Sequence, residues 1–423
     1  MSLLYNSVTL DADKCMGCTN CIKRCPTEAI RVRDGKARII SERCIDCGEC
    51  ITACPYHAKR AIYDDVGRMN DFQYKIALPS PTLYGQFHNL DDIDYILTGL
   101  IGVGFDEVYE VSRSAEMLSD ATRQMMKEQK FKKPVISSAC PAVIRLIRIK
   151  FPDLCENVFP YLSPMQIAGR RAKEEAMKKT GLPAGQIGVF FITPCLAQVT
   201  DVHHPIGIEE SWIDGAFSLA EIYPGLLDCM NKVQEPLPIS KSGIIGVSWA
   251  TSGGESSALI REQHLAVDGM ENVMAVLEEI EGERMRELDF IELNACPGGC
   301  VGGVLTIENP YIAKARIQRI RKHLPVSLNR FDGDIESIKW KEKLKYIGVM
   351  KLSDDIGEAI RMMGEIDRIT ETLKGLDCGS CGAPSCRALA EDIVMGKATL
   401  DKCVFVLHKE PDSIGMIKPK DMS

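Results

Sequence analysis

The chain of 423 residues is 45% hydrophobic and 26% charged, and its formal net charge is -8. A chain of this length can bury large cores and is expected to divide into two or three domains. The mildly acidic net charge does not indicate a basic surface that would bind nucleic acid. No apolar stretch approaches the ~20 residues that span a bilayer. We therefore expect no nucleic-acid partner and no membrane span.

Two cysteine runs near the N-terminus share the form C-x2-C-x2-C-x3-C-P, and Cys15 and Cys44 begin them 29 residues apart. This spacing is typical of bacterial ferredoxins with two cubane 4Fe-4S clusters, in which the last cysteine of each run ligates the other cluster. It predicts one cluster on Cys15, Cys18, Cys21 and Cys54 and a second on Cys44, Cys47, Cys50 and Cys25. A zinc ribbon would instead show paired C-x2-C knuckles, and a disulfide framework is typical of short secreted chains.

Residues 1–64 are expected to form an α+β domain like a bacterial ferredoxin. Short β-prone segments flank the cluster loops at residues 7–10, 30–32 and 37–40, and Asp34-Gly35 is a hairpin turn signal. Residues 1–9 contain no basic segment followed by an apolar one, so no export signal is expected. Many thiols without such a signal predict a reducing, cytoplasmic location in which the cysteines bind metal.

Between residues 65 and 350, short apolar runs alternate with helical stretches. Strands are expected at residues 75–78, 135–138, 187–192, 243–247 and 289–293. This alternation is typical of an α/β domain with a mainly parallel sheet, whose functional loops follow the carboxyl ends of the strands. The loops after three of these strands carry Cys140, Cys195, Cys296 and Cys300. Four thiolates from three strand ends predict one further cubane.

Residues 351–423 are expected to form a small helical iron-sulfur domain. Apolar side chains recur at helical spacing along residues 353–374 and define one face of a helix. Four cysteines follow this helix: Cys378, Cys381, Cys386 and Cys403. They predict a fourth 4Fe-4S cluster. The same four ligands could form a zinc site, and the other clusters of the chain favour the cubane.

The three central loops contain Ser-Ser-Ala-Cys-Pro, Thr-Pro-Cys and Cys-Pro-Gly-Gly-Cys-Val-Gly-Gly, in that order. In form and order they resemble the signature loops of iron-iron (FeFe) hydrogenases, and with the ferredoxin segment the resemblance covers most of the chain. It implies an FeFe-hydrogenase-like domain that binds the H-cluster, a 4Fe-4S cubane joined to a di-iron site with CO, cyanide and a bridging dithiolate. It also implies that Cys140, Cys195, Cys296 and Cys300 ligate this cubane, and that Cys300 bridges to the di-iron site.

Several positions depart from the catalytic members of this family. Ala139 stands where those members have a cysteine that relays protons, and a methyl group cannot pass a proton. Gln198 replaces a lysine that pairs with cyanide, which exchanges a point charge for a neutral hydrogen-bond donor. Thr193 and Asn294 stand where methionine is usual. The resemblance is therefore to the sensory branch of the family.

Two further segments are candidates for contact with the cofactor. Pro79-Ser80 resembles a family position that hydrogen-bonds a cyanide of the di-iron site. Gly253-Gly254 either lines the cofactor pocket or caps a strand-to-helix turn. We expect both segments to lie near the H-cluster cysteines.

The resemblance implies an FeFe-hydrogenase that cleaves H2 reversibly and reduces protons at an H-cluster, coupled to electron transfer through 4Fe-4S clusters. The missing relay predicts low turnover and H2 sensing. The partners implied are H2, protons, a redox protein such as ferredoxin, hydrogenase maturation proteins and a signalling partner. The alternative is an electron carrier or iron-sulfur assembly scaffold that is related to hydrogenases and lacks the H-cluster. The intact loop around Cys300 argues against this alternative.

Overall fold

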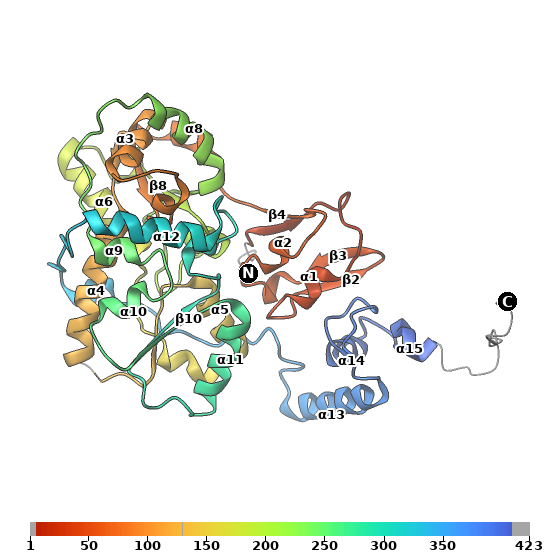
Figure 1. Ribbon diagram of the computed structural model, residues 1–423. Coiled ribbons are helices and arrows are strands. Elements are labelled where there is room, and N and C mark those ends of the chain that lie inside the picture. The colour runs from red at the N-terminus through yellow and green to blue at the C-terminus, as the bar shows by residue number, and fades with distance from the viewer. Residues whose placement is uncertain (1–5, 129, 408–423) are drawn as a thin grey trace, which may run out of the picture. The chain divides into compact units, whose positions relative to one another are not determined.

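A computed structural model describes residues 6–128 and 130–407 of the chain (Figure 1). The chain folds into two compact units. Of the described residues, the larger unit comprises 6–9, 44–48, 60–128 and 130–347, and the smaller unit comprises 10–43, 49–59 and 348–407. Within the described ranges, no helix is both long and apolar enough to cross a membrane. The domain boundaries proposed at residues 64 and 350 remain predictions.

Two parallel sheets form the centre of the larger unit. The first has the order β6-β5-β8-β9, with β5 (Tyr74–Pro79), β6 (Glu107–Val108), β8 (Ile187–Thr193) and β9 (Gly215–Ser218). The second has the order β10-β11-β7, with β7 (Val135–Ile136), β10 (His264–Asp268) and β11 (Phe290–Asn294). The seven residues of β8 are all buried, as expected for a strand in a sheet that is covered on both faces. The predicted α/β fold with mainly parallel sheets is confirmed.

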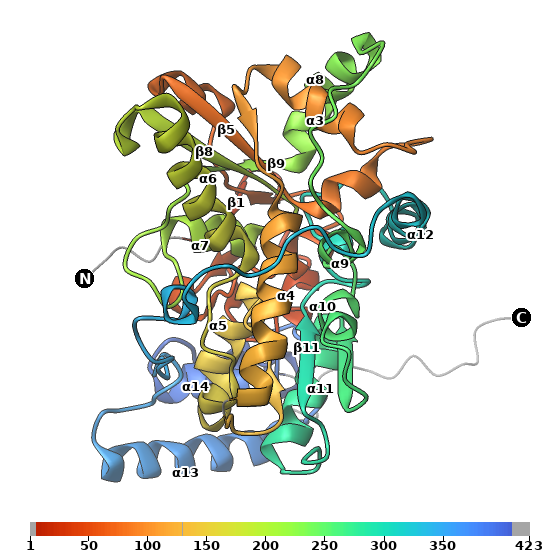
Figure 2. The same ribbon diagram turned by 90° about the vertical axis from the view of Figure 1, so that its left-hand side faces the viewer.

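Helices cover these sheets. They are α3 (Asp94–Val103), α4 (Val111–Glu128), α5 (Pro141–Lys150), α6 (Pro164–Thr180), α7 (Leu196–His203), α8 (Leu219–Lys232), α9 (Ile244–Ser248), α10 (Gly254–Ala258), α11 (Met270–Glu281) and α12 (Pro310–Ile320). Figure 2 shows the long helix α4 between α6 and α9, and it packs against both. Helix α5 follows β7 and helix α7 follows β8, and both start at loops that carry predicted cluster cysteines.

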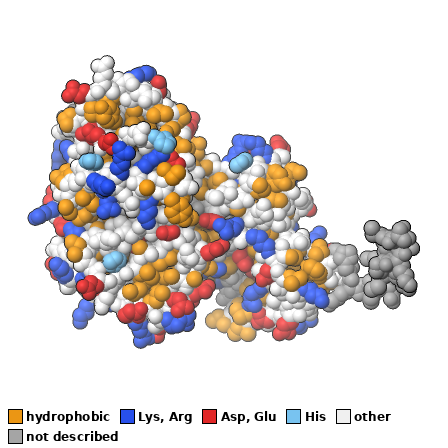
Figure 3. Space-filling view, viewed as in Figure 1, with side chains coloured by type: hydrophobic (Ala, Val, Ile, Leu, Met, Phe, Trp, Pro, Cys, Tyr) orange, Lys and Arg blue, Asp and Glu red, His pale blue; other side chains and the backbone are white. Residues whose placement is uncertain are grey.

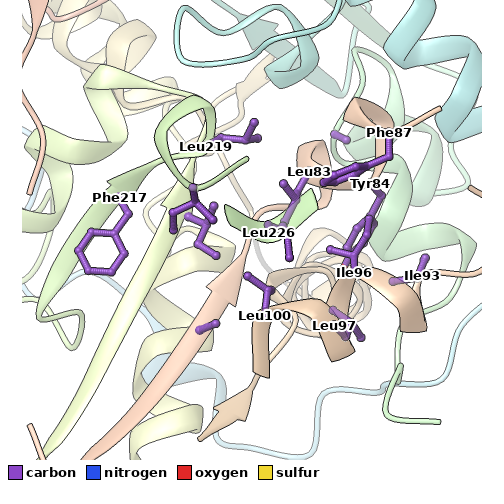
Figure 4. Packing of buried hydrophobic residues seen from close by; sticks show 14 of the residues in the cluster. Leu83, Tyr84, Phe87, Ile93, Ile96, Leu97, Leu100, Phe217, Leu219 and Leu226 are labelled. Atoms are coloured by element: carbon purple, nitrogen blue, oxygen red, sulfur yellow. The ribbon is translucent and has the colours of Figure 1, made fainter. Parts of the chain in front are cut away.

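A hydrophobic core lies between the first sheet and helices α3 and α8. Its buried side chains come from η3 (Pro81–Gln86), α3, β9 and α8, as Figure 4 shows. The buried rings of Phe190 and Phe217 stack with their centroids 4.9 Å apart. Full burial of one such side chain contributes about 1.5–3 kcal/mol, so this core fixes the sheet and the loops that leave it.

The strand predicted at residues 243–247 is wrong, because the structure has helix α9 there. A short apolar run between glycines cannot be assigned to strand or helix by periodicity alone. Packing against α4 decides the outcome. A Cβ atom at Gly246 would lie 2.1 Å from the carbonyl oxygen of Ser112, so glycine allows the two helix backbones to approach closely.

The smaller unit contains the ferredoxin hairpin and the C-terminal helices. Its elements are α1 (Asn20–Lys23), β2 (Ile30–Arg33), β3 (Lys36–Ile39), α2 (Glu49–Thr52), α13 (Ile356–Thr372), α14 (Cys386–Val394) and α15 (Val404–Leu407). Strands β1 (Val8–Leu10) and β4 (Lys59–Ala61) pair with each other, and most of their residues belong to the larger unit. The antiparallel hairpin β2-β3 turns at Asp34 and Gly35, whose φ angles of 53° and 70° fit a type I′ turn. Arg31 and Arg33 of this hairpin both bind Asp392 of α14.

Helix α13 is confirmed, but only part of its predicted apolar face is covered. Ile366 and Leu373, toward the end of the helix, are buried, and α13 packs against α14. Ile356, Ile360 and Met363, toward its start, are 77%, 67% and 51% exposed. The apolar face of the first half of α13 is therefore not covered by other described residues of the smaller unit.

The surface carries charges of both signs. On the face shown in Figure 3, Lys and Arg side chains alternate with Asp and Glu, and hydrophobic groups are scattered among them. This mixture is consistent with a formal net charge of only -8 over 423 residues. The side chains gathered around the interior cavities are more informative than this surface.

Candidate metal centre

Four half-buried thiols lie on three loops that leave the carboxyl ends of strands in the larger unit. Cys140 follows β7, Cys195 follows β8, and Cys296 and Cys300 follow β11. Strands β7 and β11 belong to the second sheet, so their carboxyl ends lie at the same edge and bring Cys140, Cys296 and Cys300 together. Cys195 reaches them from β8 of the first sheet.

Helix N-termini provide hydrogen-bond donors to two of these thiols. Cys140 is the N-cap of α5 and Cys195 is the N-cap of α7. The free N–H groups of a first helical turn favour a negative charge beside them. Donors of this kind, including the N–H of Ala142 at Cys140 and of Ala197 at Cys195, lower the thiol pKa values against the effect of burial. They favour the thiolate, which is the form that binds metal.

The four thiols are electrostatic neighbours. The pKa of Cys296 is raised well above its usual value, first by burial and then by Cys195, Cys140 and Cys300. Burial and the neighbouring Cys140 raise the pKa of Cys195 to about 12. Bare thiolates would repel one another strongly in such a dry site. The arrangement fits a positively charged inorganic core that binds all four.

The glycines around Cys300 allow loops to pack against one another. A Cβ atom at Gly299 would lie 2.4 Å from the backbone nitrogen of Ser252, and one at Gly303 would lie 2.3 Å from the carbonyl oxygen of Pro194. Gly299 also has a φ of 93°, which disfavours other residues. The glycines therefore bring the Cys300 loop into backbone contact with the loop that carries Cys195.

A cavity lies beside these thiols. Of the four cysteines, Cys300 is the one that lines it. Its other polar or sequence-predicted lining residues are Ser80, Ala139, Ser163, Gln198, Glu255, Glu292 and Asn294. The hydroxyl of Ser163 is buried and has no hydrogen-bond partner within the described chain. An unsatisfied hydroxyl fits a polar ligand that the cavity would hold.

Other predicted residues lie close to the cavity without lining it. Pro79 ends β5, one residue before the lining residue Ser80. Gly253 and Gly254 begin α10, and the N–H of Gly253 donates to Glu292. A Cβ atom at Gly254 would lie 1.9 Å from the carbonyl oxygen of Ser248. These glycines shape the turn that precedes α10.

Two of the departures from the family pattern are in direct contact. The Thr193 hydroxyl donates to Oε1 of Gln198 over 2.9 Å, and it also accepts from the N–H of Cys195. Since the Gln198 oxygen is engaged, its amide NH2 group is the end that can donate to a ligand in the cavity. Thr193 therefore orients the residue that replaces the usual lysine.

Sequence reasoning missed a pair of buried carboxyl groups at the cavity. Burial and, after it, the neighbouring Glu292 raise the pKa of Glu255 to about 8, although the hydrogen bond from Ser137 opposes the rise. The Ser137 hydroxyl donates to Glu255 over 2.6 Å and accepts from the N–H of Ala139. Burial also raises the pKa of Glu292. There was little indication of this pair in the sequence, because two glutamates far apart in the chain are usually surface residues, and only the fold shows that they lie together.

A buried guanidinium group balances other charges near Cys140 and Cys195. Arg145 of α5 donates to the carbonyl oxygen of Ala197 over 3.2 Å and lies 3.9 Å from a carboxylate oxygen of Asp46. Burial raises the pKa of Asp201 to about 6, and the Arg145 charge opposes this rise. Arg145 is thus a positive charge that the fold holds beside the thiol cluster.

The smaller unit contains two further cavities bordered by thiols. One is lined by Cys15, Cys18, Cys21 and Cys54. The other is lined by Cys378, Cys381, Cys386 and Cys403. Each contains a complete predicted ligand set. In the described part of the chain, no three His, Cys, Asp or Glu side chains converge closely enough to hold a single metal ion.

The remaining predicted ligand set is divided between the two units. Cys44 and Cys47 belong to the larger unit, while Cys25 and Cys50 belong to the smaller unit. Their assembly around one cluster stays a prediction.

Comparison with known proteins identifies the family. Residues 73–304, more than half of the chain, match the family model of the iron only hydrogenase large subunit, C-terminal domain. The chain belongs to the iron-only hydrogenase family. Residues 7–55 match a 4Fe-4S dicluster domain, and residues 373–405 match an Fe-S cluster domain. The protein is therefore a hydrogenase-like iron-sulfur protein with cluster domains at both ends of the hydrogenase domain.

Individual relatives are distant. Iron hydrogenase 1 of Clostridium pasteurianum is 25% identical over 295 residues, and the chain spans about half of its length, 50%. The cytosolic Fe-S cluster assembly factor nar1 of Aspergillus flavus is 24% identical over 36% of this chain and 27% of that protein. A solved variant of FeFe-hydrogenase HydA1 from Chlamydomonas reinhardtii has a TM-score of 0.51 at 14% identity, over 68% of this chain and 96% of that one. This last similarity shows a shared fold.

Proposed function

We propose that this hydrogenase-family protein binds an H-cluster in the larger unit and uses it for reversible H2 cleavage and proton reduction. The observation that carries the proposal is the convergence of four half-buried thiols beside a cavity that is also lined by a pair of buried carboxyl groups. In this proposal Cys140, Cys195, Cys296 and Cys300 hold the cubane. Cys300 also holds the di-iron site, since it is the ligand that lines the cavity.

The cavity residues would bind and orient the di-iron part. When bound, that part supplies the metal chemistry of H2 cleavage through its CO, cyanide and dithiolate ligands. The hydroxyl groups of Ser163 and Ser80 and the amide of Gln198 line the cavity and can donate hydrogen bonds to cyanide. A neutral amide at Gln198 stabilises an anion less than an ammonium would.

Protons would reach the cavity by a route without cysteine. The hydroxyl of Ser137 and the carboxyl of Glu255 are hydrogen-bonded to each other beside Ala139. With a pKa of about 8, Glu255 can hold a proton at neutral pH and release it without a large cost. We assign Glu255 the role of proton holder, and the lack of a donor at Ala139 itself limits turnover.

Electrons would pass between the central cubane and the ferredoxin clusters. Cys47, a predicted ligand of the second ferredoxin cluster, is among the charges that act on Cys296. A Cβ atom at Gly48 would lie 2.5 Å from the Val304 side chain, so the loop of Cys47 packs tightly against the loop that follows Cys300. Such proximity supports electron exchange with a redox protein such as ferredoxin through the chain of clusters.

Low turnover favours H2 sensing over bulk H2 metabolism. A sensor needs to bind H2 and change its redox state, and it needs no rapid proton supply. In this proposal maturation proteins supply the di-iron part, and a signalling partner reads the redox state of the clusters. The C-terminal iron-sulfur segment is the proposed output, since it is added to the hydrogenase domain.

Infrared spectroscopy tests the proposal directly. After the full chain is supplied with the di-iron precursor, CO and cyanide stretches should appear between the amide and thiol regions. Cys300→Ser should remove these bands and retain the iron of the other clusters. Cys155→Ser, which changes a thiol outside the cavities, is the matched control and should keep the bands. A matured wild-type chain without CO or cyanide bands would exclude the H-cluster.

An H-cluster-less scaffold is the second candidate. The similarity to the assembly factor nar1 favours it, although that similarity covers only 36% of this chain. Such a protein would keep the cubanes and lack the di-iron part. The same infrared experiment separates the two candidates, because a scaffold would show iron and sulfide without CO or cyanide.

A further inference from the structure

The two cysteine runs differ at one buried position. Ile30 lies five residues after Cys25, the last cysteine of the first run, and Lys59 lies five residues after Cys54, the last cysteine of the second. Ile30 is in β2 and Lys59 is in β4, and both residues are buried, with 2% and 3% of their surface exposed. An ammonium group therefore occupies a position that the repeat fills with an apolar side chain.

The ammonium group of Lys59 has no hydrogen-bond partner in the described part of the chain. Its Nζ atom is buried and forms no hydrogen bond with any residue that the structure describes. Burying an ion without a partner costs several kcal/mol, and buried lysines are rare for this reason. The fold retains this lysine at a position where isoleucine fits in the other repeat. A negative group other than a carboxylate is therefore expected to offset the cost.

The surroundings of Lys59 identify that group. Lys59 lines the same cavity as Cys15, Cys18, Cys21 and Cys54. A cubane bound by four thiolates has a net negative charge, because the thiolates outweigh the charge of the core. That cluster is the counter-ion that the protein atoms do not provide.

We propose that Lys59 is a built-in positive charge that raises the reduction potential of the cubane held by Cys15, Cys18, Cys21 and Cys54. The potential of an iron-sulfur cluster is set by nearby charge, hydrogen bonds and exposure to solvent. A cation at close range in a dry site stabilises the reduced, more negative cluster more than the oxidised one. The two ferredoxin cubanes thus differ, although their cysteine runs are the same.

This difference gives the cubane beside Lys59 a distinct role. It is the ferredoxin cluster that accepts an electron more easily, and it holds that electron while the other cluster is oxidised. In a chain of clusters such a site stores the first electron that arrives. The proposal rests on the 4Fe-4S dicluster assignment and on the predicted ligands, and it does not require hydrogen chemistry.

A redox titration of the full chain, prepared without the di-iron part and monitored by electron paramagnetic resonance, tests this role. Lys59→Met removes the charge and keeps a long apolar side chain. It should shift one cubane to a more negative potential while the iron content stays unchanged. Lys59→Arg keeps the charge and should leave the potential near the wild-type value. A purely structural role would instead change the iron content and leave the potentials in place.

A matched control and a double variant locate the effect. Lys14→Met removes an exposed cation beside Cys15 and should cause a much smaller shift, because water and salt screen surface charges. Cys18→Ser alters a ligand of the proposed cubane and should change the signal that Lys59→Met shifts. The proposal is overturned if Lys59→Met shifts no cluster reduction potential, or if its largest shift is no greater than that of Lys14→Met. It is also overturned if Cys18→Ser leaves the shifted signal unchanged. Because no H2 assay enters, these outcomes are independent of whether the H-cluster forms.

Discussion

The buried carboxyl group of Glu255 provides a quantitative test of the cavity. Its pKa is raised from 4.5 to about 8, first by burial and then by Glu292, while the Ser137 hydroxyl opposes the rise. The folded chain therefore keeps a proton that the unfolded chain releases. The contribution of Glu255 to stability is fully present below pH 4.5 and is lost as the pH rises toward 8.

The size of this stability change follows from the difference between the two pKa values of Glu255, 4.5 and about 8. A tenfold change in a proton equilibrium is worth about 1.4 kcal/mol, so the complete loss is on the order of 5 kcal/mol. Glu255→Gln removes the titrating group, and its amide oxygen can still accept the hydrogen bond from Ser137. We expect the free energy of unfolding of the variant to fall less steeply between pH 5 and 8, by up to about 1.4 kcal/mol per pH unit.

Two measurements check this expectation. Difference infrared spectra of the full chain should show a protonated carboxyl band that disappears near pH 8 and is absent from Glu255→Gln. Denaturant unfolding at several pH values should show the change in slope, with the exposed Glu287→Gln as the control. If wild type and Glu255→Gln lose the same carboxyl band and have the same slope, Glu255 is not the protonated group and the proposed proton route fails.

Three further substitutions test other parts of the structure. Ala139→Cys should raise H2 turnover of the matured protein by about 10²-fold or more, because it places a proton donor in the cavity; an unchanged rate in an H2 uptake assay would mean that another step limits turnover. Asp392→Ala removes the carboxylate partner of the buried Arg31 guanidinium, which would keep only backbone carbonyl partners, and should cost about 3–5 kcal/mol in denaturant unfolding, whereas a loss under 1 kcal/mol would contradict the buried ion pair. Phe217→Ala opens the core shown in Figure 4 and should also cost about 3–5 kcal/mol, and a change within error would show that the core closes around the gap.

Local pattern predicted most of the fold. The strand β8 and the turn at Asp34-Gly35 could be predicted from the sequence, because each is determined by residues adjacent in the chain. The error at residues 243–247 has a different origin. That run is too short to define its own periodicity, and the contact of Gly246 with Ser112 of α4, far away in sequence, decides that it is helical. The half-exposed α13 likewise has a clear period that does not reveal how much of its face is covered.

The cysteines of the candidate site were predictable because their spacing is a property of the chain itself. Ser137, Glu255 and Arg145 were not, since each has meaning only beside a partner that the fold supplies. A glutamate or an arginine in an isolated sequence is most often a surface residue. The sequence therefore indicates which metal is bound before it indicates how protons and charge around that metal are controlled.

Buried charges are the clearest remaining guide to function in this chain. Glu255 and Lys59 are both ionisable groups that the fold buries where an apolar residue would be more stable. A buried ionisable residue that lowers stability is expected mainly where its charge or proton serves a functional site. Glu255 is buried beside the central thiols, and Lys59 is buried beside the ferredoxin thiols. The first places a proton and the second places a positive charge at an iron-sulfur site, so the two residues are expected to control different properties: the pH dependence at one site and the reduction potential at the other.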